Sequence, residues 1–379
     1  MKKLLVITLL ALLVAACMSN NVEPPAKLAP FTPGVRVNRL WSASVGSADS
    51  ILRLGIVVAS DGINVYAAGH DGEVSAFALK NGRRLWRTST GQAITAGPGV
   101  GNGLVVVGTQ QGEVLALDAA TGKQEWKANV PGMLLASPAA NAAAVVVHTT
   151  DGHIIGLAPA SGKQLWNVTH QVPNLVLRGS GTPVLGPDTA YVGLADGSLQ
   201  ALSLADGSQR WLAVVSAASG SNDLARLAAL NGSLALGSNN IYAVTYQGKI
   251  AAVGRESGQI LWSRDMSSYT GAREDATDIF VSDTHSAVWA LSKSTGVPVW
   301  TQPQMRARDL TVPVPFGDTV VAGDLQGYLF FLSQKDGSVV ARERLGGDPI
   351  LAPPIVVGDT LVVLSTNGDL AAYRLAPLK

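Results

Sequence analysis

Short apolar runs separated by turn-forming residues follow one another along the chain from about residue 37 to its end. Segments such as "LVVVGT", "AVVVHT" and "TVVAGD" are rich in β-branched residues, whereas "EVLALD" and "SLQALS" alternate apolar with polar side chains. Both patterns are typical of β-strands. The sequence therefore predicts an all-β protein whose short strands are joined by tight turns.

Two glycine turns and a tryptophan recur in a fixed order through these strands. The first turn ends on a glycine at Gly72, Gly112, Gly152, Gly197, Gly248, Gly327 and Gly368, with Ser286 in register. A second turn glycine follows ten residues later, at Gly82, Gly122, Gly162, Gly207, Gly258, Gly296 and Gly337. Four residues further on the chain has Trp86, Trp126, Trp166, Trp211, Trp262 and Trp300, with Ala341 in the seventh slot.

A repeat of about 42 residues with two paired turns predicts a propeller blade, a four-stranded antiparallel meander. Each blade buries its two apolar faces against its neighbours. Eight first turns are present, but the last, at Gly368, is not followed by room for a fourth strand. We predict that residues 37–44, "VNRLWSAS", supply this strand by pairing with "DLAAYRL". The expected fold is one eight-bladed β-propeller over residues 37–379, closed by pairing of the N-terminal strand with the C-terminal blade.

We interpret the recurring glycines and tryptophans as architecture. Glycine at a tight turn adopts a positive φ at little steric cost. A tryptophan at a fixed strand position can cover the next blade while its N–H reaches a backbone carbonyl. A catalytic residue is not expected at seven equivalent places around a ring. Trp289 lies off this register and is expected to pack within its own blade.

The first residues predict a lipoprotein signal peptide over residues 1–16. Lys2 and Lys3 form a positive n-region, and the apolar h-region that follows is too short to span a bilayer. The next residues, "VAAC", resemble a bacterial lipobox. We therefore expect cleavage before Cys17 and lipidation of this cysteine, which is the only cysteine in the chain.

Residues 17–36 are rich in Pro, Asn and Ala, so we expect a flexible tether between the lipid and the folded body. Met18 in place of an aspartate after the cysteine indicates the outer membrane, with the protein lipid-anchored and facing the periplasm. Without Lys2 and Lys3 the mature chain has 26 basic and 27 acidic residues. This balance provides no basic field for nucleic acid.

The tryptophan repeat also resembles the docking repeats of quinoprotein alcohol dehydrogenases. Those enzymes need, in addition, an adjacent cysteine pair, carboxylate and amide ligands to calcium, and a catalytic aspartate. In this chain no cysteine follows Cys17, no acidic cluster has metal-loop spacing, and the five histidines form no H-E-x-x-H motif. A nucleophile elbow is also missing. We therefore predict a non-enzymatic binding scaffold with no catalytic residue, metal or cofactor.

Function on propellers usually lies in loops that depart from the repeat. The connections after Trp41, Trp166 and Trp211 are longer than the others, and two of them are neighbours on one face of the ring. The loop after Trp211, residues 212–233, either contains a short helix in "NDLARLAAL" or forms a mobile flap.

The loop after Trp166 contains Leu175, Leu177 and Arg178 within "NVTHQVPNLVLRGSG". Alternating apolar residues followed by an arginine suit a protein interface, because the leucines share one side and the guanidinium can form bidentate bonds. The alternative is that these leucines begin the inner strand of the next blade and fill the core.

The lipobox, the eight tryptophan-repeat blades, "VPNLVLRG" and "DLQGYLFFLSQKDGSVVAR" together resemble the BamB family, the lipoproteins of the outer-membrane β-barrel assembly (BAM) machinery. The resemblance covers nearly the whole mature chain. In that family the L-x-L-R loop binds the periplasmic POTRA domains of the insertase BamA. The resemblance thus implies a partner-binding role for Leu175, Leu177 and Arg178.

Family members can also carry a D-x-D pair in the following long loop. The matching positions in this chain hold Ala229 and Asn231, which puts the acidic part of the contact in doubt. Arg308 and Asp309, in "RARDLTVP" at the entrance to blade seven, form either a structural ion pair or a second partner contact.

The resemblance implies a scaffold that binds BamA and other BAM subunits and assists the folding and insertion of β-barrel proteins. Direct binding of unfolded outer-membrane proteins, by strand addition at a blade edge, is a further hypothesis. Two alternatives from other classes are a quinone-dependent dehydrogenase-like propeller and a propeller that binds peptidoglycan or carbohydrate.

Overall fold

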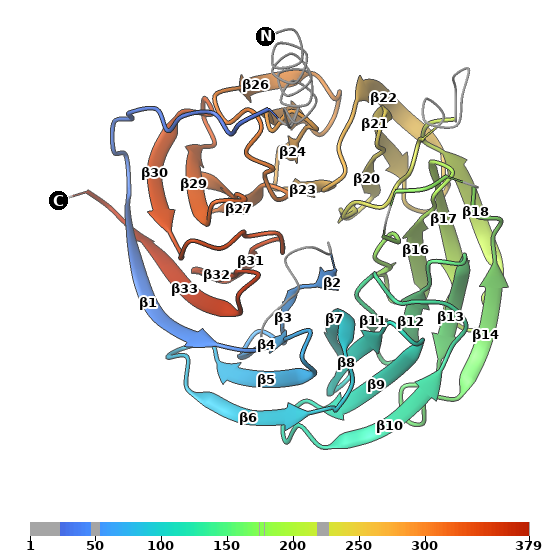
Figure 1. Ribbon diagram of the computed structural model, residues 1–379. Helices are drawn as coiled ribbons and strands as arrows, with labels where there is room; N and C mark the ends of the chain where they lie inside the picture. Colours follow the sequence, from blue (N-terminus) through green and yellow to red (C-terminus); the bar gives the residue numbers. More distant parts are fainter. Residues whose placement is uncertain (1–22, 47–53, 174, 178, 218–226, 379) are drawn as a thin grey trace, which may run out of the picture.

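In the computed structural model, blades of β-sheet are arranged in a closed ring (Figure 1). The structure describes residues 23–378 apart from 47–53, 174, 178 and 218–226. The predicted signal peptide and Cys17 lie outside this part of the chain, as does Arg178. Within the described part, no helix is long and apolar enough to cross a membrane.

Each blade has four antiparallel strands, which follow one another from the inner to the outer edge of the ring. Blades one and two comprise β3 (Val58–Ser60), β4 (Asn64–Ala68), β5 (Glu73–Ala78), β6 (Arg84–Ser89), and then β7 (Ile94–Gly101), β8 (Leu104–Thr109), β9 (Glu113–Asp118), β10 (Gln124–Asn129). Blades three and four comprise β11 (Ala139–Ala140), β12 (Val145–His148), β13 (His153–Leu157), β14 (Gln164–Thr169), and then β15 (Val184–Leu185), β16 (Thr189–Gly193), β17 (Ser198–Ser203), β18 (Gln209–Val214).

Blades five and six comprise β19 (Ala235–Leu236), β20 (Asn240–Val244), β21 (Gly248–Gly254), β22 (Ile260–Met266), and then β23 (Ala272–Glu274), β24 (Asp278–Ser282), β25 (Val288–Ser292), β26 (Pro298–Gln302). Blade seven comprises β27 (Val314–Phe316), β28 (Thr319–Gly323), β29 (Tyr328–Ser333) and β30 (Val339–Arg344). Blade eight comprises β31 (Ile355–Val357), β32 (Thr360–Leu364), β33 (Asp369–Ala376) and β1 (Arg36–Ser44). A short extra strand, β2 (Gly55–Ile56), pairs in parallel with β7.

The ring closes as the sequence predicts. Strand β1 pairs antiparallel with β33, from Arg36 opposite Ala376 to Ser44 opposite Asp369. The two ends of the propeller therefore share one blade. Strand β33 is paired on both of its edges, with β32 and with β1. The predicted eight-bladed β-propeller is confirmed.

The tryptophans of the repeat dock onto the following blade. Each indole N–H donates to a backbone carbonyl there, at 2.7–3.0 Å. The indole ring lies against the second turn glycine of that blade, where an added Cβ would come within 2.4–2.9 Å of an indole carbon. The seven indoles of this kind belong to Trp41, Trp86, Trp126, Trp166, Trp211, Trp262 and Trp300. Trp289 instead donates to Asp283 of its own blade, at 2.9 Å. The architectural interpretation of these residues is confirmed.

In blade seven, which lacks the tryptophan, the large and the small residue of the facing pair have exchanged places. The residue opposite each tryptophan in the sheet is small: Ala372, Ala76, Ala116, Gly156, Ala201, Ala252 and Ala290. In blade seven the sizes are reversed, and Ala341 lies opposite Phe331. Blade eight has no second turn because its last two strands come from distant parts of the chain. An indole at position 341 would therefore have no turn on which to dock.

One of the predicted first turns differs in detail. In blade five the positive φ falls on Gln247 (φ 49°), and Gly248 begins β21 with an ordinary backbone. A Cβ at Gly248 would lie 2.3 Å from Thr245 Oγ1 and 2.4 Å from Ser216 Oγ. Gly248 is thus needed for close packing, and the prediction that it supplies the positive φ is wrong.

The segment that precedes β1 also differs from its prediction. Residues 23–35 lie along blade seven, past β26 and β30 (Figure 1, blue), and several hydrogen bonds hold them there. The expectation of a flexible tether over residues 17–36 is therefore wrong for its described part. Proline-rich composition alone does not reveal docking, because the partners of the segment lie about 280 residues further along the chain.

Candidate docking surface

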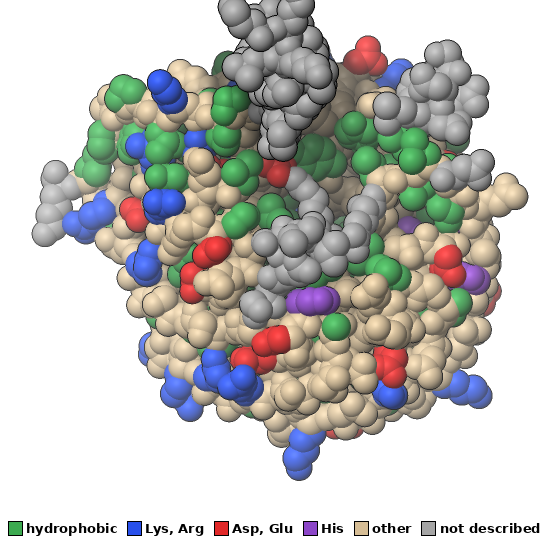
Figure 2. Space-filling model, viewed as in Figure 1, with side chains coloured by type: hydrophobic (Ala, Val, Ile, Leu, Met, Phe, Trp, Pro, Cys, Tyr) green, Lys and Arg blue, Asp and Glu red, His purple; other side chains and the backbone are tan. Residues whose placement is uncertain are grey.

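The connections between blades open onto the same face of the ring as the first turns. After the outer strands, Thr90 and Val130 donate backbone hydrogen bonds to the turn glycines Gly72 and Gly112, at 2.9 and 2.8 Å. Figure 2 shows lysine and arginine side chains (blue) mainly around the edge of the ring, and apolar side chains (green) both around the hollow and over the upper left of the ring. A cavity of about 670 Å³ lies among these connections.

Leu175 lies on the surface of the connection between blades three and four. Its side chain is 43% exposed, and the inner strand β15 begins only at Val184. The alternative that Leu175 starts this strand and fills the core is therefore wrong. An exposed leucine on an irregular loop is available for contact with another protein.

Leu177 is half-buried and lines the cavity together with Tyr246 and Tyr269. The two leucines thus have different surroundings, because Leu175 faces solvent whereas Leu177 supports the loop from its inner side. Arg178, the third residue predicted for this contact, lies outside the described residues. The sequence pattern did locate a surface loop, but it did not separate these two roles.

The second long loop supports the first one. The side-chain amide of Asn231 donates to the backbone carbonyl oxygens of Leu177 and Gly179, at 3.3 and 3.1 Å. Ala229 is 2% exposed, and its carbonyl accepts from the N–H of Tyr246 at 2.9 Å. Of the two positions matched to an acidic pair, one is therefore buried and the other holds the neighbouring loop.

The helix expected in "NDLARLAAL" is not formed over residues 227–230. These residues are irregular and buried, and Leu230 packs with Leu199, Trp211 and Ile241 in one core cluster. Burial between two blades provides more apolar contact than one exposed helical turn would. The preceding residues of the predicted helix or flap, 218–226, lie outside the described part of the chain.

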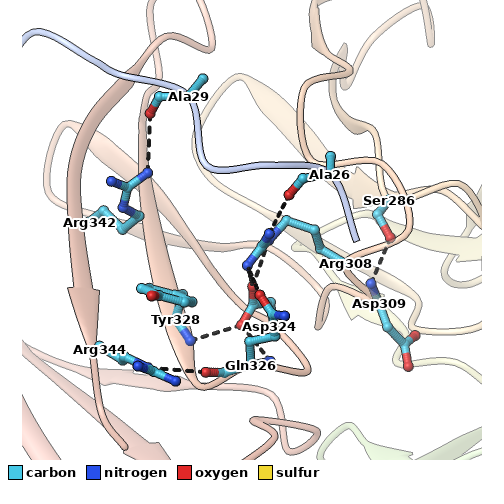
Figure 3. A network of polar contacts seen from close by, with 10 residues as sticks. All are labelled: Ala26, Ala29, Ser286, Arg308, Asp309, Asp324, Gln326, Tyr328, Arg342 and Arg344. Atoms are coloured by element: carbon cyan, nitrogen blue, oxygen red, sulfur yellow. Dashed lines mark hydrogen bonds and ion pairs between the residues drawn. The ribbon is translucent and has the colours of Figure 1, made fainter. Parts of the chain in front are cut away.

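Arg308 belongs to the interior of blade seven. Its side chain is 3% exposed, and its guanidinium binds Asp324 Oδ2 through Nε at 2.7 Å and through Nη2 at 2.6 Å (Figure 3). It also donates to Gln326 Oε1 at 2.7 Å. Of the two alternatives, the structure favours an ion pair, but with Asp324 in place of Asp309. The buried position of Arg308 therefore speaks for a structural role and against direct contact with a partner.

Asp309 follows Arg308 with a positive φ of 54°, and its side chain points away from that of Arg308 (Figure 3). Its carboxylate accepts a hydrogen bond from the hydroxyl of Tyr269, which lines the central cavity. Its backbone N–H donates to Ser286 Oγ at 2.9 Å (Figure 3). Of these two neighbouring residues, Asp309 is thus the one that contacts a residue lining the cavity.

One ionisable group near the loop at Leu175 is deeply buried. Among the described residues, no group of three or more His, Cys, Asp or Glu side chains could hold a metal ion. His148 lies next to Gly181, which follows the loop at Leu175 and Leu177 (hereafter the docking loop), and burial lowers its pKa to about 4. Its Nδ1 lies 2.9 Å from the carbonyl oxygen of Gly181. The arrangement thus presents one exposed apolar side chain on a loop to which Asn231 donates two hydrogen bonds.

Known proteins are similar to this chain in sequence and in fold. A family model described as "Outer membrane protein assembly factor BamB" matches residues 70–302. Proteins of that name from Pseudomonas aeruginosa and Alkalilimnicola ehrlichii are both 47% identical, covering 97% and 99% of this chain and 97% of each relative.

Solved structures of other proteins superpose on this chain. The crystal structure of BamB from Moraxella catarrhalis superposes with a TM-score of 0.81 at 27% identity, covering 89% of this chain and 100% of that one. A quinohemoprotein alcohol dehydrogenase from Comamonas testosteroni has a TM-score of 0.70 at 12% identity, covering 89% of this chain and 76% of that one, so it shares the fold alone. The chain belongs to the BamB family of outer membrane protein assembly factors.

Proposed function

We propose that this outer membrane protein assembly factor is a non-enzymatic scaffold, and that its loop at Leu175–Arg178 docks onto the POTRA domains of BamA. The observation that carries the proposal is the exposed side chain of Leu175 on a loop to which Asn231 donates two hydrogen bonds. A large apolar side chain in such a place loses water when a partner covers it, which favours binding.

The contacts that Asn231 and Leu177 make with the rest of the protein also favour this proposal. A loop that is already ordered loses little conformational entropy when it binds. Two hydrogen bonds from Asn231 and the contacts of Leu177 in the cavity limit the motion of the loop. Leu175 is thus presented to BamA, and through BamA to the other subunits of the BAM complex, in a preformed arrangement.

The location follows from the N-terminal sequence. We propose that residues 1–16 are removed as a signal peptide and that lipid on Cys17 anchors the protein to the periplasmic side of the outer membrane. The lipobox-like "VAAC" directly after the apolar run supports attachment to the bilayer through Cys17.

A pull-down with purified BamA POTRA domains tests the docking proposal. The triple variant Leu175→Ala/Leu177→Ala/Arg178→Ala is expected to lose at least tenfold in affinity while its thermal unfolding stays cooperative. Leu165→Ala removes an equally exposed leucine from the outer strand of blade three and serves as the matched control. Unchanged binding of the folded triple variant would overturn the proposal.

A further inference from the structure

Residues 23–35 form a strap whose N-terminal end is seated on blade seven. The backbone N–H of Ala26 donates to the carbonyl of Arg306 at 2.9 Å. The carbonyl of Ala26 accepts from Nη1 of the buried Arg308 (Figure 3). Glu23 and Arg306 form an ion pair at 2.6 Å. The start of the strap is therefore attached to the connection between blades six and seven.

The rest of the strap follows the outer strand β30. Arg342 donates to the carbonyl of Ala29 at 3.2 Å and stacks over the ring of Phe31 at 5.2 Å. Leu28 packs against the apolar cluster of blades six and seven. The N–H of Gly34 donates to the carbonyl of Val340 at 2.9 Å. Polar and apolar contacts thus hold the strap along its whole described length.

The composition of the strap adds stiffness to these contacts. Pro24, Pro25, Pro30 and Pro33 restrict φ and favour extended backbone. Such a segment transmits position from one end to the other better than a glycine-rich linker of equal length. The strap also lies beside the open edge of β30, which would otherwise be free to pair with another strand.

The position of the strap limits where the membrane can lie. Five residues lie between Cys17 and Glu23, so a fully extended chain across these six steps spans at most about 22 Å. A lipid on Cys17 therefore keeps the connection between blades six and seven close to the bilayer. The docking loop follows β14 in blade three, on the other side of the ring (Figure 1).

We propose that the rim of blades six and seven is the surface of the propeller that faces the phospholipid leaflet, and that the strap holds it there. The docking loop at Leu175 then lies on the side of the ring that is far from the bilayer, within the periplasm. The exposed side chain of Lys27 lies at this rim and attracts anionic headgroups. The inference rests on lipidation of Cys17, which is part of the proposed function.

Energy transfer to labelled lipid tests the orientation. The full lipidated protein is placed in vesicles of phosphatidylethanolamine and phosphatidylglycerol that carry an acceptor on the headgroup. A donor dye is attached to Thr301→Cys in blade six or to Asn167→Cys in blade three, which are matched exposed positions directly after Trp300 and Trp166. Cys17 carries the lipid, so each variant has one reactive thiol. We expect at least twofold greater transfer from position 301.

A strap variant makes the result specific. Leu28→Ser/Phe31→Ser removes the apolar contacts of the strap and should equalise transfer from the two positions, whereas the exposed control Thr32→Ala should not. Equal transfer in the unaltered strap, or a difference that survives in Leu28→Ser/Phe31→Ser, would overturn the inference. Failure of the protein to associate with vesicles would overturn it as well.

Proteolysis tests the seating of the strap independently of the membrane. Trypsin cleaves after Lys27, within the seated segment, so the full lipidated chain in detergent should be cut there at least tenfold more slowly than Leu28→Ser/Phe31→Ser. Equal rates would contradict a seated strap. BamA binding reports separately on the proposed function, because loss of that binding with the vesicle result intact contradicts only the docking loop.

Discussion

The side-chain amide of Asn231 donates a hydrogen bond to the backbone carbonyl oxygen of Leu177 at 3.3 Å and a second to that of Gly179 at 3.1 Å. These bonds join the two long neighbouring connections of the docking face. The amide nitrogen is essential to the arrangement, since both groups it meets are acceptors. A carboxylate at this position would place oxygen against oxygen.

Asn231→Asp is therefore expected to weaken binding to BamA POTRA domains by about tenfold, because two bonds of about 1 kcal/mol each are lost and the loop loosens. Titration of the purified proteins measures the effect. Asn239→Asp makes the same chemical change at an exposed site and should leave the affinity unchanged. Stronger binding by Asn231→Asp would instead indicate that an acidic residue at this position contacts the partner directly.

Arg308→Ala is expected to lower the free energy of unfolding by about 3–5 kcal/mol, because it leaves the buried carboxylate of Asp324 unpaired. Thermal or denaturant unfolding measures this loss. Arg306→Ala removes the exposed ion pair with Glu23 and should cost less than about 1 kcal/mol. Similar stability of the two variants would show that the buried pair contributes little.

The docking of tryptophans onto turn glycines can be measured by a matched pair of substitutions. Gly103 and Gly122 have φ values of 73° and 71°, but only Gly122 lies against an indole, that of Trp86. Gly103→Ala should cost about 1–2 kcal/mol from backbone strain alone. Gly122→Ala should cost about 1–3 kcal/mol more, because its Cβ displaces the indole. Equal losses of unfolding free energy would contradict this role.

His148 should make stability depend on pH. Burial lowers its pKa in the folded protein to about 4, below the ordinary value near 6.5. Between pH 6.5 and 4 the unfolded chain binds a proton that the folded chain does not bind. Stability that is complete above pH 6.5 is therefore lost as the pH falls, by about 3 kcal/mol at most.

Unfolding of His148→Gln across this pH range checks the expectation. The slope of stability against pH should become shallower in His148→Gln and should persist in the control His285→Gln, since His285 is exposed. An unchanged slope in His148→Gln would contradict the assignment.

The blades could be predicted from the sequence because their signals are local. A turn glycine, a strand of alternating residues and a tryptophan recur at one spacing, and each forms its structure with residues close by in the chain. The closing strand followed from the same register, since Trp41 matched the fourth strand that blade eight lacked. The exposed loop at Leu175 was found as an interruption of this register.

Other features required the tertiary structure, because their partners are distant in sequence or differ between adjacent residues. Arg308 and Asp309 are neighbours in the chain, yet one binds Asp324 inside blade seven and the other meets Tyr269 at the cavity. The strap meets blade seven across 282 residues, from Ala26 to Arg308. The sequence by itself thus determined the repeating ring, whose contacts are periodic. Folding decided how the strap is seated and how Asn231 supports the loop, because these contacts occur once and depend on which surfaces the closed ring brings together.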